Sequence, residues 1–255
     1  MRLRLVVLLL ALAARAAAGE EQKAVYRASG IDGRLFDQYD NDGYSLTVRT
    51  EADGSLTLSV RVSDGPLDSA APFPTGQRPE PTPVAAPDRN AFARSLTSGS
   101  RTQREAVRRI LLGLAGEVRY DGDRLRLQDP FAVFASRRAY CVGFSELAVD
   151  LLRRAGISAR TVQGVLHSEP GADRYESRIG GVFHRWIEVY YRDRGYVFSD
   201  PMYSVNGIDA RYVPFGRRAL ARPRDLRLTA LTLEGGLDYE SVAVGDHTLR
   251  VRASR

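Results

Sequence analysis

The chain has 255 residues, of which 44% are hydrophobic and 27% charged, and its formal net charge is +6 at pH 7. This length is sufficient for a sizeable hydrophobic core. Three of the arginines lie in the first 18 residues, so the rest of the chain carries about +3, with acidic residues interspersed. That weak excess excludes the strongly basic surface that nucleic-acid binding requires.

The first 18 residues have the pattern of a signal peptide. Arg2 and Arg4 precede an apolar run at residues 5–14 that is too short to span a bilayer, and residues 16–18 are small side chains suited to cleavage before Gly19. An uncleaved anchor is the alternative, which the short run disfavours. We therefore expect a secreted or periplasmic protein with no stable membrane insertion after the signal is removed.

Residues 19–65 predict an N-terminal β region. Apolar and polar residues alternate over 44–48 and 56–62, and Asp53-Gly54 lies between these runs, as in a β-hairpin. The acidic segment 37–43 does not match the spacing of an EF-hand calcium loop, so we interpret it as a turn. The proline-rich residues 66–88 predict a linker.

Two amphipathic helices are predicted in the middle of the chain. Thr102 and Glu105 form a capping box before apolar residues at helical spacing. A second helix begins at Cys141, with one apolar face, and Gly156 is placed to end it. The apolar positions of this second helix are Phe144, Leu147, Ala148, Leu151, Leu152 and Ala155.

Cys141 is the single cysteine of the chain, so it has no internal disulfide partner. Its expected position is the first turn of the helix, where unpaired backbone N–H groups and the positive end of the helix dipole favour a thiolate. The thiolate is the nucleophilic form of cysteine. Alone, a cysteine is more often a small buried apolar residue.

An imidazole and a carboxylate follow in order. Residues 182–191 are rich in β-branched and aromatic side chains and predict a strand that carries His184. A polar break with Gly195 and a second short strand precede Asp200. A hairpin of this length brings Asp200 beside His184, where the carboxylate orients one ring nitrogen while the other faces the thiol.

These segments resemble the transglutaminase-like superfamily, a branch of the papain-like thiol enzymes. The resemblance extends roughly from Ala91 to Val213. It rests on four motifs in order, which are Cys141-Val142-Gly143-Phe144-Ser145, Leu151 to Ile157 followed by Ala159-Arg160, His184-Arg185-Trp186-Ile187-Glu188-Val189, and Asp200-Pro201.

The resemblance implies an α+β fold, with N-terminal helices and a cysteine helix packed on an antiparallel sheet, and with β regions on either side. Residues 89–215 are the expected catalytic domain. Cys141 is then the nucleophile, His184 the base and Asp200 the orienting acid.

The surroundings of this triad are less well defined by the sequence. The backbone N–H of Cys141 is the natural first oxyanion donor, and Tyr140 is one candidate for a side-chain donor. Trp186 and Glu188 share the strand face of His184, which predicts supporting roles beside it. His167 is a weaker alternative base, because it lacks the strand motif around His184. No metal-ligand spacing is present, and we expect no cofactor.

Residues 216–255 predict a C-terminal β tail. Leu226, Leu228, Leu231 and Leu233 indicate a strand whose alternation slips, as at a bulge, and residues 241–251 indicate a hairpin. Each segment presents one apolar face that needs cover. We therefore expect the tail to pack with the hairpin formed by residues 44–62.

The predicted chemistry is attack of a thiolate on the carbonyl carbon of a peptide or glutamine amide to form a thioester. Release to water makes a peptidase or amidase, which we favour, and release to an amine makes a transglutaminase. The expected partner is a peptide or protein substrate. The alternative is an inactive binding or scaffold module, because Ala139 and Arg185 stand where the superfamily usually has a glycine and a small residue.

Overall fold

A computed structural model gives the structure of the protein. It describes residues 21–31, 34–63, 67–76, 87–168, 180–217, 223 and 225–252. The predicted signal peptide and much of the predicted linker lie outside the described residues. Within these ranges, none of the helices combines the length and the apolar character needed to cross a membrane.

A four-stranded sheet lies in the middle of the molecule. It contains β7 (Ala159–His167), β8 (Gly181–Tyr191), β9 (Gly195–Ser199) and β11 (Tyr212–Pro214), in the order β11-β7-β8-β9, with antiparallel pairs. The predicted strand at 182–191 is therefore confirmed. Alternation along β8 separates two apolar cores, since Trp186 faces one and Ile187 and Val189 face the other.

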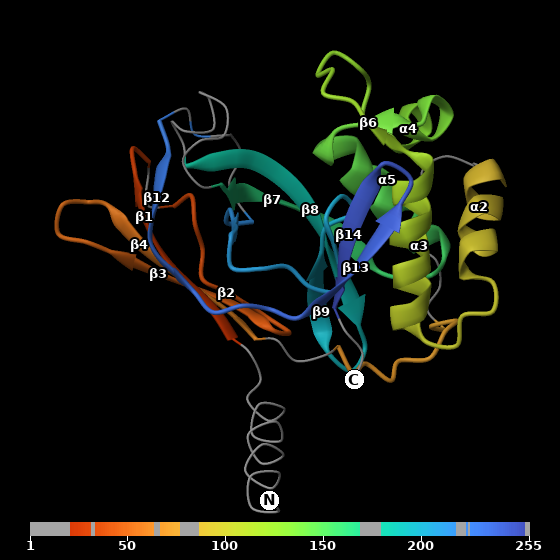
Figure 1. Ribbon diagram of the computed structural model, residues 1–255, viewed down its shortest axis with the longest axis horizontal. Coiled ribbons are helices and arrows are strands. Elements are labelled where there is room, and N and C mark those ends of the chain that lie inside the picture. Colours follow the sequence, from red (N-terminus) through yellow and green to blue (C-terminus); the bar gives the residue numbers. More distant parts are fainter. Residues whose placement is uncertain are drawn as a thin grey trace, which may run out of the picture.

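Helices cover one face of this central sheet (Figure 1). They are α2 (Pro87–Thr97), α3 (Gln103–Glu117), α4 (Pro130–Ser136) and α5 (Cys141–Arg154). The Thr102 side chain caps α3 by accepting from the Glu105 N–H, as predicted. The apolar face of α5 packs in one core with Ile187 and Val189 of β8, so this helix is held against the strand that carries His184.

The end of α5 is a Schellman motif. Gly156 has a φ of 75°, its N–H donates to the Arg153 carbonyl at 3.0 Å, and the Ile157 N–H donates to the Leu152 carbonyl at 2.9 Å. This left-handed conformation suits glycine. Ile157 is fully buried, so the chain turns directly from α5 into β7.

A five-stranded sheet covers the other face of the central sheet (Figure 1). Its order is β12-β1-β4-β3-β2. The strands are β1 (Glu21–Ser29), β2 (Tyr39–Asn41), β3 (Tyr44–Thr50), β4 (Leu56–Ser63) and β12 (Arg227–Glu234). The pairing of β1 with β12 shifts register so that Leu231 is left over, which is the predicted bulge.

The C-terminal strands belong to two different sheets. Strand β12 joins the sheet that contains the 44–62 hairpin, as expected. The hairpin of β13 (Tyr239–Val244) and β14 (His247–Arg252) does not, because β14 pairs with β10 (Ser204–Val205). Leu249 and Val251 of β14 are buried in the core that contains the helices, so the expected packing of the whole tail was wrong for this hairpin.

A short parallel pair fixes the approach to α5. Strands β5 (Arg119–Tyr120) and β6 (Arg138–Ala139) pair with each other, and the Asp121 N–H donates to the Ala139 carbonyl at 2.8 Å. The intervening loop and α4 are thereby held next to the first turn of α5.

Candidate active site

Cys141 is the first residue of α5, as predicted, and Tyr140 is its N-cap. The Tyr140 side chain makes no capping hydrogen bond, so it leaves the first-turn amides available. The backbone N–H of Tyr140 donates instead to Oε1 of Gln128 at 3.1 Å. Gly143 permits this close packing, since a Cβ there would lie 2.4 Å from the same Gln128 oxygen and 2.8 Å from Ala139 Cβ.

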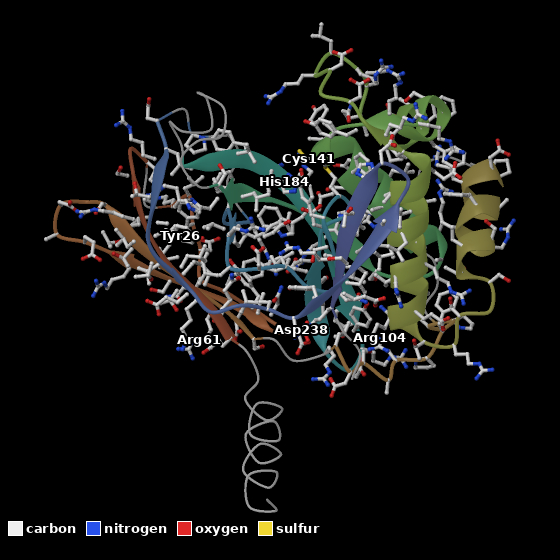
Figure 2. All side chains as sticks on the ribbon, viewed as in Figure 1. Tyr26, Arg61, Arg104, Cys141, His184 and Asp238 are labelled. Atoms are coloured by element: carbon white, nitrogen blue, oxygen red, sulfur yellow. The ribbon has the colours of Figure 1, made fainter. Side chains whose placement is uncertain are left out.

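His184 lies on β8 opposite this helix end (Figure 2). Its Nε2 is 2.6 Å from Oδ2 of Asp200, and its side chain forms a hydrogen bond with the Cys141 thiol. Because Nε2 is occupied by the carboxylate, Nδ1 is the nitrogen that faces the sulfur. The backbone N–H of Arg185 also donates to Cys141, so two neighbouring residues of β8 hold the thiol.

Asp200 immediately follows β9 and is fully buried. One of its oxygens accepts from both His184 and the Tyr212 hydroxyl, at 2.6 and 2.8 Å, and the other accepts from the Met202 N–H at 2.8 Å. A buried carboxylate that accepts three hydrogen bonds is held in one orientation. The structure therefore brings together the three residues expected to form the triad.

The pKa values of Cys141 and His184 are shifted in opposite directions. Burial raises the pKa of Cys141, but the hydrogen bond and charge of His184 outweigh it and, with the Arg185 N–H, hold this pKa below its ordinary value. Burial lowers the pKa of His184, but the Asp200 carboxylate and the hydrogen bonds with Asp200 and Cys141 raise it to about 10. The pair therefore favours a thiolate beside an imidazolium.

The residues expected to support the triad have different positions. Tyr140 contributes the N-cap and its backbone N–H. Trp186 stacks on the His184 ring with centroids 6.2 Å apart. The expectation that Glu188 lies beside His184 is corrected, because its carboxylate contacts Arg160 and Tyr39 instead. Four residues of extended strand span about 13 Å, so sharing a face with His184 does not make Glu188 its neighbour.

His167 is also separate from the triad. One of its ring nitrogens is 2.6 Å from the Gly180 carbonyl, and the ring packs against Tyr26. The described residues hold no group of three His, Cys, Asp or Glu side chains that could bind a metal ion.

The two departures from the usual motif are accommodated. Ala139 is fully buried next to Gly143. The Arg185 side chain lies away from His184 and pairs with Glu146 of α5 at 2.7 Å. Both residues therefore contribute to the contact between α5 and its surroundings and leave the triad intact.

Sequence reasoning missed Tyr212 and Gln128. Tyr212 reaches Asp200 because β11 pairs with the far end of β7, where Tyr212 lies opposite Leu166. Gln128 reaches Tyr140 because β5 and β6 close the intervening loop. Neither residue belongs to a local motif, so only long-range pairing would have revealed them.

Large apolar side chains are exposed on β5, on the loop that follows it and on α4, all of which precede α5. Leu125 is 96% exposed, Leu127 71%, Phe131 68% and Tyr120 60%. The loop is nevertheless fixed, since Asp121 pairs with Arg126 and the Gln128 Nε2 donates to the Arg126 carbonyl. These four side chains form an apolar surface, which we call the apolar rim, and the loop joins the cysteine helix through Gln128.

Comparison with known proteins identifies the region that contains this site. The sequence model of the transglutaminase-like superfamily matches residues 90–201, from α2 to the residue after Asp200. This segment is a transglutaminase-like domain. The fold expected from the sequence is confirmed: it is α+β, with the cysteine helix packed on an antiparallel sheet and β regions on either side.

A curated relative of the transglutaminase-like domain is the uncharacterized protein YebA of Bacillus subtilis (strain 168), which is 34% identical over 76 residues. The match covers 27% of this chain and 10% of YebA, so the chain spans only a small part of that protein.

Solved structures with a similar arrangement include a candidate cysteine protease from Cytophaga hutchinsonii. It has 14% identity, a TM-score of 0.45, and coverage of 89% of this chain and 94% of that one. The periplasmic domain of TgpA from Pseudomonas aeruginosa, bound to ethylmercury, has 17% identity, a TM-score of 0.39, and coverage of 76% and 93%. These identities and TM-scores do not identify an activity.

Proposed function

We propose that the protein is a thiol enzyme that acts on peptide or glutamine side-chain amides through a thioester on Cys141. The observation that carries the proposal is the contact of the Cys141 thiol with His184, whose ring is held by the buried Asp200. The depressed pKa of Cys141 and the raised pKa of His184 support a thiolate–imidazolium pair.

In the proposed reaction the thiolate attacks the amide carbonyl carbon and the carbonyl oxygen becomes an oxyanion. The His184 imidazolium then gives its proton to the nitrogen that leaves as an amine, and the C–N bond breaks to give the thioester. Neutral His184 next takes a proton from the incoming water or amine, which attacks the thioester and releases the thiolate. Asp200 holds the ring in the orientation that both proton transfers need.

Two groups at the start of α5 are the proposed oxyanion donors. The first is the backbone N–H of Cys141, which lies in the uncapped first turn. The second is Gln128, whose Oε1 accepts from the Tyr140 N–H while one hydrogen of its Nε2 donates to the Arg126 carbonyl, so the other Nε2 hydrogen is the proposed donor. Tyr140 contributes to this helix end through its backbone, so we favour Gln128 over Tyr140 as the side-chain donor.

Hydrolysis is the preferred outcome of the thioester. Cys141 is only partly buried, so water has access to the sulfur. To test this, a glutamine-containing peptide is supplied with and without an excess of primary amine, and the products are weighed. We expect the acid product in both cases. Amine incorporation as the main product would make the enzyme a transglutaminase instead, and no reaction of any amide would contradict the proposed activity.

The apolar rim supports a preference for substrates with apolar side chains near the reacting amide. Its side chains are exposed on a fixed loop, so a substrate can cover them without an ordering cost for the loop. Tyr203 is 42% exposed and its ring centroid lies 5.7 Å from that of His184, so it adds an exposed aromatic ring beside the triad.

Export is proposed from the sequence of residues 1–18. Sequencing the N-terminus of the protein recovered from outside the cytoplasm tests it, and we expect the first residue to be Gly19. Recovery of the intact chain with the membrane fraction would contradict it.

A further inference from the structure

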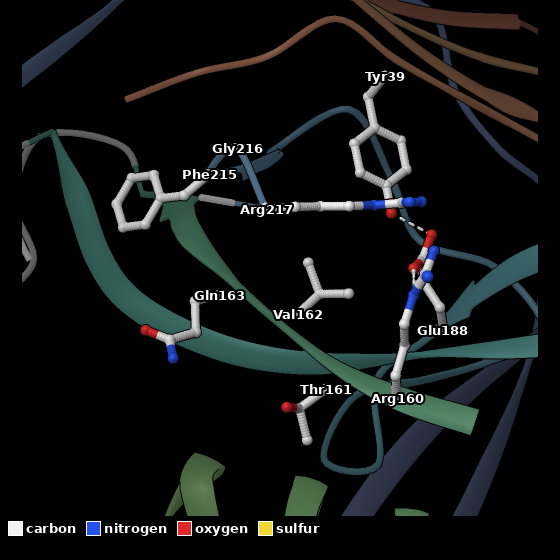
Figure 3. Close-up of a pocket in the computed structure, with 9 residues that line it drawn as sticks. All are labelled: Tyr39, Arg160, Thr161, Val162, Gln163, Glu188, Phe215, Gly216 and Arg217. Atoms are coloured by element: carbon white, nitrogen blue, oxygen red, sulfur yellow. Dashed lines mark hydrogen bonds and ion pairs between the residues drawn. The ribbon is translucent and has the colours of Figure 1, made fainter. Parts of the chain in front are cut away.

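A recess of about 300 Å³ lies on the face of the central sheet opposite α5, between β7, β2 and the segment after β11 (Figure 3). Its lining includes none of the three triad residues. The proposed reaction therefore gives no role to this recess, although its volume is within the lower range of small-ligand sites.

The recess has an excess of positive charge. Arg160 and Arg217 both line it, whereas Glu188 is the single carboxylate in the lining. Glu188 is almost fully buried and already accepts from Arg160 Nε, at 2.5 Å, and from the Tyr39 hydroxyl. Figure 3 shows the Arg217 side chain extending toward Tyr39 and Glu188. The Arg217 side chain hydrogen-bonds with Tyr39, whereas both oxygens of the single carboxylate are used by Arg160 and Tyr39.

Arg160 retains an unused donor. Its guanidinium carbon lies 3.8 Å from the centre of the Tyr196 ring, which fixes the planar group by stacking. Its Nη2 atom is buried and has no hydrogen-bond partner among the described residues. Buried donors without partners are uncommon, which singles out this atom as a donor for a ligand. A ligand oxygen within hydrogen-bond distance of this atom would give the donor a partner.

The remaining walls provide apolar and backbone contacts. Val162 and Phe215 give the recess an apolar side. Strand β11 pairs with β7 only at residues 164–166, and beyond them the Phe215 N–H donates to the Gln163 carbonyl at 2.8 Å. The backbone groups of Thr161 point to the same edge as those of Gln163, because direction alternates along a strand. Among the described residues no strand pairs with them on this side, so they face the recess.

We propose that this recess binds a carboxylate attached to an apolar group, either a free organic acid or the chain end of a peptide. Arg217 and Arg160 bind the carboxylate, as a guanidinium does by paired hydrogen bonds. Val162 and Phe215 contact the apolar group. The open edge at Thr161 provides a hydrogen-bond partner that a peptide can use and a simple acid cannot.

The test measures binding by titration calorimetry to the full chain with Cys141→Ala, so that no probe is turned over. The free-acid probe is benzoate, with benzamide as its neutral match. The chain-end probe is N-acetyl-alanyl-phenylalanine, with its C-terminal amide as the match. Arg217→Met removes one charge from the recess. Arg49→Met removes one charge from β3 at a side chain that is 72% exposed and outside the recess.

We expect at least one acid to bind and its amide to bind at least tenfold more weakly. Arg217→Met should weaken binding of the acid at least tenfold, and Arg49→Met should leave its affinity unchanged. Binding of benzoate assigns the site to free acids, and binding of the peptide alone assigns it to chain ends. The proposal is overturned if neither acid binds at about 10 mM, which is already weak for a specific site. It is also overturned if the amides bind equally well, or if Arg217→Met and Arg49→Met behave alike.

Discussion

Strand β8 carries two polar clusters on one face, and they differ in what each can do. His184 and Asp200 form one cluster at 2.6 Å, and Glu188 and Arg160 form the other at 2.5 Å. His184 contacts a thiol at the start of a helix, and its pKa is raised to about 10. Glu188 contacts the Arg160 guanidinium and the Tyr39 hydroxyl. Burial raises the pKa of Tyr39 above its ordinary value. The imidazole of the first cluster can exchange a proton with the thiol, whereas the second cluster joins a carboxylate to a guanidinium and a tyrosine hydroxyl.

The contrast shows that position on a strand does not determine the role of a carboxylate or an imidazole. Asp200 and Glu188 are both almost fully buried. The element packed over each cluster decides its chemistry: the first turn of α5 provides a reactive sulfur, and β2 provides a tyrosine. Substitutions at the first cluster should therefore mainly lower activity, and substitutions at the second should mainly lower stability.

The largest expected effect is on the nucleophile. Cys141→Ala removes the sulfur on which the proposed thioester forms, so amide turnover should fall by about 10⁴-fold or more. The thiol is only partly buried, so the midpoint of thermal unfolding should change little. Turnover by mass spectrometry and unfolding by circular dichroism check this, and turnover that survives the substitution would rule out the thioester.

The two carboxylates provide a matched pair of substitutions. Asp200→Asn keeps the shape of the side chain but removes the charge that stabilises protonated His184, so kcat should fall by about 10²- to 10⁴-fold. Glu188→Gln makes the same chemical change away from the thiol. It should leave kcat within a few-fold and lower the free energy of unfolding by about 1–3 kcal/mol. Equal losses of kcat in both variants would refute the separation of the clusters.

A smaller effect is expected at Tyr212, which positions Asp200. Tyr212→Phe removes a 2.8 Å hydrogen bond to the carboxylate and leaves the buried ring in place. A hydrogen bond to a charged group contributes about 1.5–3 kcal/mol. Because His184 and the Met202 N–H still hold Asp200 in the variant, only part of this energy should be lost from the transition state, and kcat should fall by roughly tenfold. The pH profile of kcat should also shift, because the charge on Asp200 sets the pKa of His184. A change in stability without any change in that profile would make Tyr212 merely structural.

The smallest effect is expected at the apolar rim. The double substitution Leu125→Ser and Leu127→Ser should raise KM for a peptide with apolar residues several-fold, because each exposed leucine loses its contact with substrate. A small polar amide substrate should be unaffected, and so should the rate of alkylation of Cys141. Equal changes for both substrates would argue against a role in substrate recognition.

The elements that hold the triad were predictable from sequence because each has a local pattern. The apolar face of α5, the β-branched run of β8 and the order of Cys141, His184 and Asp200 are all visible within short windows. Tyr212, Gln128 and the Arg160–Glu188 pair were not visible, because β11, the β5–β6 pair and the β7–β8 register bring them into place from distant positions. The position of the β13–β14 hairpin was missed for the same reason, since its partner β10 is only two residues long.

The most direct test of the account is the rate of iodoacetamide alkylation of native Cys141 against pH, in the wild type and in His184→Asn. The wild type should alkylate rapidly below the ordinary thiol pKa of about 8.5, because His184 stabilises the thiolate, and His184→Asn should require that higher pH. Amide turnover in the wild type should decline as pH rises through the His184 pKa of about 10, since the leaving amine then lacks its proton donor, while alkylation continues. Identical alkylation profiles in the two proteins would contradict a thiolate–imidazolium pair.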